Sequence, residues 1–227
     1  KVKLQITCPD QSCYTYLISD RGAYDTFPLT AGNGSYALQV LENVAGDTYT
    51  VSLAQSINVS IEDEFLPFLY PNQYVNFHTD SKAVSKGSDL AKDTYSDLDV
   101  VQNIYNYVIK NISYDTEKAQ NVSYGYVPDI DDTLSSKKGI CFDYAALMTS
   151  MLRSQNIPTK LEVGYSGDAY HAWISTYIDD KGWVDDIIQF NGDTWQIMDP
   201  TLAATNDSAA VKKYVGDGSH YVVKYTY

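Results

Sequence analysis

Cys141 stands at the start of a segment in which apolar side chains recur at helical spacing, and this cysteine is the first candidate for chemistry. The recurring residues are Tyr144, Leu147, Met148, Met151 and Leu152. The pattern predicts a helix that begins at Cys141 and ends before Pro158. Unpaired N–H groups and the positive dipole end of a helix N-terminus favour thiolate over thiol and can receive an oxyanion. A lone cysteine is more often a small buried core residue, so a nucleophile needs partners.

His171 and Asp199 are the candidate partners, and each lies on a predicted strand. Alternation predicts strands over Lys160–Tyr165 and Tyr170–Ile178, and His171 begins the second of them. Asp199 ends a third predicted strand, which Pro200 stops. Alone, a histidine near a tryptophan is equally a core residue with satisfied hydrogen bonds, and an aspartate before a proline is a common strand end.

The three candidates lie in motifs that resemble those of the transglutaminase-like superfamily. The motifs are Gly139-Ile140-Cys141-Phe142-Asp143-Tyr144-Ala145, His171-Ala172-Trp173 and Asp199-Pro200-Thr201, in the order of that family. The resemblance covers residues from about Val100 to Ala204. It implies that Cys141 is the nucleophile, His171 the general base and acid, and Asp199 the group that orients the imidazole. It also implies a papain-like core, in which the cysteine helix packs on an antiparallel sheet that bears the histidine and the aspartate.

One spacing departs from that pattern, because Asp199 follows His171 by 28 residues. A plain meander of three strands would leave the two side chains at opposite ends of parallel strands. We therefore expect an inserted crossover loop from Gly182 to about Ile187, and antiparallel pairing of Thr194–Met198 with Ala172–Tyr177. Asp185 and Asp186 are the alternative orienting residues.

Neighbouring residues are expected to complete the site. In the family, an oxyanion donor comes from a separate upstream loop, and Tyr114, Tyr124 and Tyr126 are the aromatic candidates here. Asp143 and Tyr144 match the family motif and are expected to support the helix start, where an acidic side chain is favourable. Tyr170 and Trp173 are expected to pack around the imidazole.

The resemblance implies cysteine-dependent acyl transfer, or hydrolysis, at amide bonds of peptides, proteins or cell-wall material through a thioester. The alternative is a non-catalytic cell-surface binding or structural module that retains the fold. No cofactor is expected. No metal is expected either, because Cys8, Cys13 and the histidines lack ligand spacing and no calcium loop is recognisable.

The rest of the chain divides near residue 70. Short alternating segments broken by turn residues predict an all-β, sandwich-like domain of about five strands over residues 1–70. These segments are Cys13–Ile18, Tyr36–Val40, Thr48–Leu53 and Ile57–Ile61. Residues 71–227 are expected to form the α+β catalytic domain. Its first clear helix is predicted over Ser96–Asn111, with Ser96 and Asp99 as a capping box, and a long loop is predicted over Ser113–Lys138.

Composition bears on partners and compartment. The formal net charge of −13 disfavours nucleic acid and anionic membranes as partners. No apolar run approaches the ~20 residues needed to span a bilayer, and the start lacks a signal-peptide core, so the chain is expected to be soluble and already trimmed. Cys8 and Cys13 are expected to form a disulfide, which would place the protein outside the cell or on its surface.

Overall fold

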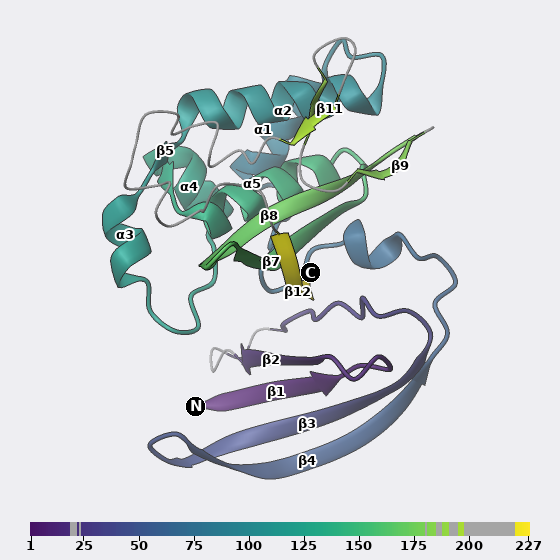
Figure 1. Ribbon diagram of the computed structural model, residues 1–227, viewed down its shortest axis with the longest axis vertical. Helices are drawn as coiled ribbons and strands as arrows, with labels where there is room; N and C mark the ends of the chain where they lie inside the picture. Colours follow the sequence, from purple (N-terminus) through teal and green to yellow (C-terminus); the bar gives the residue numbers. More distant parts are fainter. Residues whose placement is uncertain (19–21, 23, 180, 185–187, 191–194, 198–220) are drawn as a thin grey trace. The chain divides into compact units, whose positions relative to one another are not determined.

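A computed structural model describes residues 1–18, 22, 24–179, 181–184, 188–190, 195–197 and 221–227 (Figure 1). The chain divides into two compact units, Lys1–Pro67 and Phe68–Tyr227. The predicted α+β fold is confirmed, because helices and antiparallel strands both occur and the strands of the first unit precede the helices of the second. Whether each unit folds by itself stays a prediction.

The first unit contains four strands, β1 (Val2–Thr7), β2 (Cys13–Ile18), β3 (Gly34–Ala45) and β4 (Thr48–Val59). They form one antiparallel sheet in the order β2-β1-β3-β4 within the described residues, where a sandwich of about five strands was expected. The reason is the long hairpin of β3 and β4. Gly46 turns this hairpin at a φ of 52°, and β4 merges two predicted strands that no turn residue separates.

The expected disulfide between Cys8 and Cys13 is wrong for this structure. All three cysteines fall within the described residues, and each is a free thiol. The hairpin register explains the separation: Cys13 pairs with Thr7, so Cys13 shares the face of Thr7, whereas Cys8, one residue further, points to the other face. Cys8 is accordingly buried and Cys13 exposed.

A short 3-10 helix, η1 (Leu66–Phe68), spans the boundary, and the second unit begins with helices. These are α1 (Lys82–Ala91), α2 (Asp97–Asn111), α3 (Thr116–Asn121), α4 (Ile130–Ser136) and α5 (Cys141–Arg153). Ser96 is confirmed as the N-cap of α2, because its hydroxyl accepts from the Asp99 N–H. The return bond differs from that of the predicted capping box, since the Asp99 carboxylate accepts from the Ser96 hydroxyl and the Tyr95 N–H. Helix α5 is central, since α1, α2 and α4 all pack against it.

The segment predicted as a loop over Ser113–Lys138 contains α3 and α4 as well as two short strands, β5 (Ser113–Tyr114) and β6 (Lys138–Gly139). Both helices begin at an aspartate whose side chain accepts a backbone N–H of the first turn, Asp115 for α3 and Asp129 for α4. These N-caps start helices in sequence too polar to show helical periodicity.

The main sheet of the second unit has the order β12-β7-β8-β9 and is antiparallel throughout. Its strands are β7 (Thr159–Ser166), β8 (Ala169–Ile178), β9 (Gly182–Val184) and β12 (Tyr221–Thr226). Helix α5 packs against β7 and β8, and the helices of this unit gather on one side of the sheet (Figure 1). Strands β7 and β8 match the prediction.

The pairing expected on the other side of β8 is wrong for the described residues, and residues 185–187, 194 and 198, which also belong to that expectation, lie outside them. Gly182–Val184 is not a crossover loop but strand β9, which pairs with Thr176–Ile178 directly after a tight turn. Gly182 has a φ of 84°, which lets the turn close so early. Strand β11 (Trp195–Ile197) pairs instead with β10 (Ile188–Phe190), in a separate ribbon of two strands.

Arg153, the last residue of α5, is buried, and it ties three distant segments together. Its guanidinium donates to the carbonyl oxygens of Thr159 at 2.9 Å, Tyr70 at 2.7 Å and Tyr227 at 2.7 Å. Burial lowers the pKa of Arg153. A buried cation requires partners, so each of these carbonyls contributes to stability.

The hydrogen bond from Arg153 to the Tyr70 carbonyl shows where a test of the domain prediction should begin the shortened chain. We expect a chain that begins at Phe68 to fold cooperatively, whereas one that begins at Asn72 lacks the Tyr70 carbonyl and loses about 1–3 kcal/mol of unfolding free energy. The measurement is urea denaturation of both chains beside the full chain. If neither shortened chain shows a cooperative transition, the second unit is not an independent domain.

Candidate functional site

Cys141 is the first residue of helix α5, as the sequence pattern predicts, and its side chain is partly exposed. Ile140 is the N-cap residue, with an extended backbone at φ −93° and ψ 175°. The thiol therefore lies beside the first N–H groups of the helix, which have no carbonyl partner in the preceding turn. Such N–H groups stabilise a thiolate and, later, an oxyanion.

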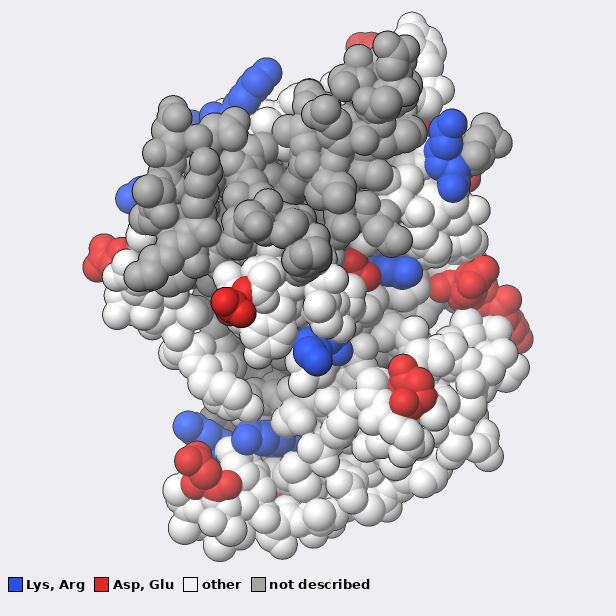
Figure 2. Space-filling model, in the orientation of Figure 1, with Lys and Arg blue, Asp and Glu red and all other residues white. Residues whose placement is uncertain are grey.

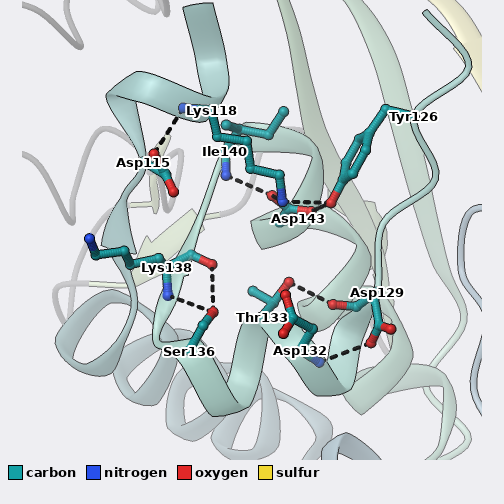
Figure 3. A network of polar contacts seen from close by, with 10 residues as sticks. All are labelled: Asp115, Lys118, Tyr126, Asp129, Asp132, Thr133, Ser136, Lys138, Ile140 and Asp143. Atoms are coloured by element: carbon teal, nitrogen blue, oxygen red, sulfur yellow. Dashed lines mark hydrogen bonds and ion pairs between the residues drawn. The ribbon is translucent and has the colours of Figure 1, made fainter. Parts of the chain in front are cut away.

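The carboxylate of Asp143, in the first turn of α5, is the centre of a buried polar network (Figure 3). It is 0% exposed and accepts three hydrogen bonds. The donors are Ile140 N–H at 2.8 Å, Lys118 Nζ at 2.7 Å and the Tyr126 hydroxyl at 2.5 Å. The bond from Ile140 closes the N-terminus of α5, so Asp143 fixes the turn that carries Cys141.

Lys118 and Tyr126 are also linked to each other. Lys118 Nζ donates to the Tyr126 hydroxyl at 2.6 Å and lies 4.5 Å from the centre of the Tyr126 ring. Burial, followed by the hydrogen bond to Asp143 and the charge of Asp143, raises the pKa of Tyr126. The phenol therefore stays protonated and donates its hydrogen to the carboxylate.

The surroundings of Gly139 explain why the residue two positions before Cys141 is a glycine. Strand β6 pairs in parallel with β5, with Gly139 opposite Tyr114, and delivers the chain to the start of α5. A Cβ atom added at Gly139 would lie 2.7 Å from Asp143 Cβ and 3.3 Å from Thr133 Cγ2. Only a residue without a side chain allows the carboxylate to reach back to the Ile140 N–H.

His171 lies on β8, opposite Gly164 of β7, and is 1% exposed. Its ring is 6.1 Å from that of Trp173 and 6.2 Å from that of Tyr221, measured between centroids, so aromatic packing around the imidazole is confirmed for Trp173. The structure thus brings together the two elements that carry Cys141 and His171, α5 and β8. The contact between the two side chains stays a prediction.

Tyr170 precedes His171 and belongs to an aromatic group on the opposite face of β8. Its ring contacts that of Tyr165 at 5.5 Å. Burial, then the neighbouring Tyr225, Tyr165 and Cys141, raise the pKa of Tyr170, so this hydroxyl is within electrostatic reach of the thiol. Because adjacent strand residues point to opposite faces, this interaction does not itself place the imidazole beside Cys141.

The candidate oxyanion donors differ in their surroundings. Tyr126 donates its hydroxyl hydrogen to Asp143 and so is not available to an oxyanion in this arrangement. Tyr114 lies on β5. Tyr124 is 77% exposed and raises the pKa of Tyr74 electrostatically. The Tyr74 ring packs on Phe142, the residue after Cys141. Tyr124 therefore remains a candidate oxyanion donor.

Asp199 and the alternative orienting residues Asp185 and Asp186 lie outside the described residues. The assignment of the orienting acid therefore stays a prediction.

Sequence reasoning missed Lys118. The lysine lies in a segment that was expected to be a loop, 25 residues before Asp143. Its only local signal is Asp115, which precedes it by three residues and caps α3 through the Lys118 N–H at 2.9 Å.

Comparison with known proteins places this core in context. A model of the transglutaminase-like superfamily matches residues 85–185. A UPF0252 protein of Methanocaldococcus jannaschii is 30% identical over 118 residues, which are 45% of this chain and 34% of that protein. Kyphoscoliosis peptidase of Mus musculus is 30% identical over 107 residues, 41% of this chain and 16% of the peptidase. The chain thus matches only a minor part of each relative's length.

Among solved structures, the periplasmic domain of TgpA from Pseudomonas aeruginosa is similar in fold. It is 13% identical, and the match covers 94% of this chain and 93% of that domain with a TM-score of 0.50. At this identity the likeness concerns the fold alone.

The packing around Gly139 generates a stability prediction. We expect Gly139→Ala to lower the unfolding free energy by about 1–3 kcal/mol, because the new methyl group collides with Asp143 in a rigid turn. Gly167→Ala is the control, since its Cβ meets no atom within 4 Å and bears only the strain of a φ of +59°. Urea denaturation compares the two. A Gly139→Ala variant that unfolds with the same free energy as the unchanged protein would show that the close approach of Asp143 carries no steric constraint.

Proposed function

Residues 85–185 of this chain belong to the transglutaminase-like superfamily, and on that premise we propose that the protein is a cysteine-dependent acyltransferase or hydrolase acting on amide bonds. Its substrates are peptides, proteins or cell-wall material. The observation that carries the proposal is the position of Cys141 as first residue of α5, with α5 packed against the strand that bears His171.

The proposed reaction has two stages. His171 accepts the thiol proton, the Cys141 thiolate attacks the amide carbonyl carbon, and the N–H groups at the start of α5 stabilise the negative oxygen. The tetrahedral intermediate collapses as the C–N bond breaks, and the imidazolium returns its proton to the leaving amine. Water or a second amine then attacks the thioester and releases the thiol. In this scheme Asp199 orients the imidazole.

The location and partners are part of the same proposal. The similar fold of a periplasmic domain supports an extracytoplasmic site of action. Cys8 and Cys13 are free thiols, so no disulfide between them adds to this support. Among the described residues, no helix is long and apolar enough to cross a membrane. On the face in Figure 2, basic side chains lie scattered among acidic and uncharged ones, which does not favour nucleic acid as a partner.

The chain supplies its own reference for thiol reactivity, because Cys13 is exposed on a strand while Cys141 begins a helix. We expect iodoacetamide to alkylate Cys141 about tenfold faster than Cys13 at about pH 6.5, since the helix start and an imidazole partner favour the thiolate. Peptide mass spectrometry after timed labelling measures both sites in one sample. His171→Ala should remove most of the difference.

Two outcomes would count against the proposal. Equal rates at Cys13 and Cys141 would leave a binding or structural module as the better description. A fast Cys141 that His171→Ala does not slow would keep the reactive thiol but assign its base elsewhere.

Turnover separates the roles of the proposed triad. With an activated ester such as nitrophenyl acetate, Cys141→Ala should abolish release of nitrophenolate, whereas Asp199→Ala should retain activity reduced by about 10²–10⁴-fold, because orientation is disturbed while the nucleophile remains. Cys13→Ala is the matched control and should leave the rate unchanged. Full activity in Asp199→Ala would exclude Asp199 as the orienting acid.

A further inference from the structure

The first turn of α5 contains an electrostatic conflict. Asp143 is needed there, because it accepts the Ile140 N–H and closes the helix start. Its charge, however, lies two residues from Cys141 in the same turn, and its side chain is 0% exposed, so water does not screen it. A like charge close by disfavours the ionised form of a titrating group, and burial strengthens the effect.

Lys118 pairs with this buried carboxylate. Its ammonium group lies 2.7 Å from Asp143 Oδ2, and the side chain is 28% exposed. A second ion pair, Lys92 with Asp89 of α1, is by contrast exposed at both ends. Lys118 thus forms its ion pair with a buried carboxylate in the first turn of α5.

We propose that Lys118 is a positioning residue for the proposed nucleophile, which neutralises Asp143 so that the carboxylate can shape the helix start without opposing thiolate formation at Cys141. This inference rests on the proposed function. Lys118 does not touch the reacting atoms and acts through Asp143. Tyr126 has a separate part, since its neutral hydroxyl holds the second carboxylate oxygen and accepts from Lys118 without adding charge.

The other ionisable groups around this turn come from each element near it. They are Tyr170 from β8, Tyr126 from the segment after α3, Asp129 and Asp132 at the start of α4, and Tyr74 beside Phe142. His171, also on β8, joins them in the proposed function. The two aspartates of α4 add negative potential at Tyr126. Lys118 is the basic side chain that the described contacts bring to the network, so its loss leaves the negative groups unopposed.

The test follows the pH midpoint of Cys141 alkylation in the full chain, with Cys13 as the internal reference. Lys118→Met should raise the midpoint by about one pH unit, because Asp143 becomes an unpaired buried charge. Asp143→Asn should lower it, because Lys118 then acts alone. The double variant, Lys118→Met with Asp143→Asn, should return it to within about 0.3 units of the unchanged protein, since both charges are gone.

Two controls isolate the charge from other effects. Lys92→Met removes the same charge from the exposed pair and should leave the midpoint unchanged. Tyr126→Phe removes a hydrogen bond to Asp143 but no charge, so it should lower stability with little effect on the midpoint. A merely structural role for Lys118 would change stability without producing shifts of opposite sign in the two single variants.

The outcomes separate this inference from the proposed function. If Cys141 in the unchanged protein reacts no faster than Cys13, the proposed function fails whatever Lys118 does. If Cys141 is activated but both single variants leave the midpoint in place, the charge-compensating role of Lys118 alone is overturned. Should Lys118→Met fail to fold, Lys118→Gln, which keeps a hydrogen-bond donor for Asp143 but no charge, takes its place and should raise the midpoint in the same direction; an unchanged midpoint in that variant overturns the role of Lys118.

Discussion

The buried carboxylate of Asp143 is the constraint around which the candidate site is organised. A buried charge must be hydrogen-bonded and paired, and each of its three donors comes from a different part of the chain. The bond from Ile140 fixes the helix start, the bond from Lys118 connects α3 to the carboxylate, and the bond from Tyr126 connects the segment between α3 and α4 to it. The motif Gly-x-Cys-x-Asp thereby acquires a physical meaning. The glycine makes room for the aspartate, and the aspartate closes the turn that presents the thiol.

What the sequence predicted well was the part of the site that depends on local periodicity. Helix α5 begins at Cys141, and β7 and β8 occupy the segments that the periodicity predicts, although all three elements are buried on more than one face. What it could not predict depends on partners distant in sequence. Lys118 is polar in a polar segment, and nothing near it shows that its ammonium group meets a carboxylate on another helix. Asp115 and Asp129 are recognisable N-cap residues, but without apolar periodicity after them the sequence does not distinguish a helix start from a loop.

The wrong strand pairing has a different origin. The expected crossover loop rests on the requirement that Asp199 lie beside His171, which is a functional argument and carries no information about strand register. The chain instead reverses directly after Ile178, and β9 pairs with the end of β8 that is distant from His171. In the first unit, Cys8 and Cys13 were judged by their spacing alone, whereas the alternation of side chains across the hairpin sets their thiols on opposite faces. In both cases strand geometry prevailed over an argument from proximity in sequence.

Helix α5 is held at both ends by buried charge, with opposite signs and different consequences. At its C-terminal end Arg153 donates only to backbone carbonyls, which suits the negative end of the helix dipole and ties the helix to β7 and to the segment before α1. At its N-terminal end Asp143 is equally suited to the positive end, but under the proposed mechanism it shares that stabilising potential with the Cys141 thiolate. The proposed role of Lys118 follows from this difference, because only the N-terminal end carries a group that the proposed reaction ionises. In that proposal the lysine beside Asp143 supplies the compensating charge, while the described contacts of Arg153 are all with carbonyl oxygens.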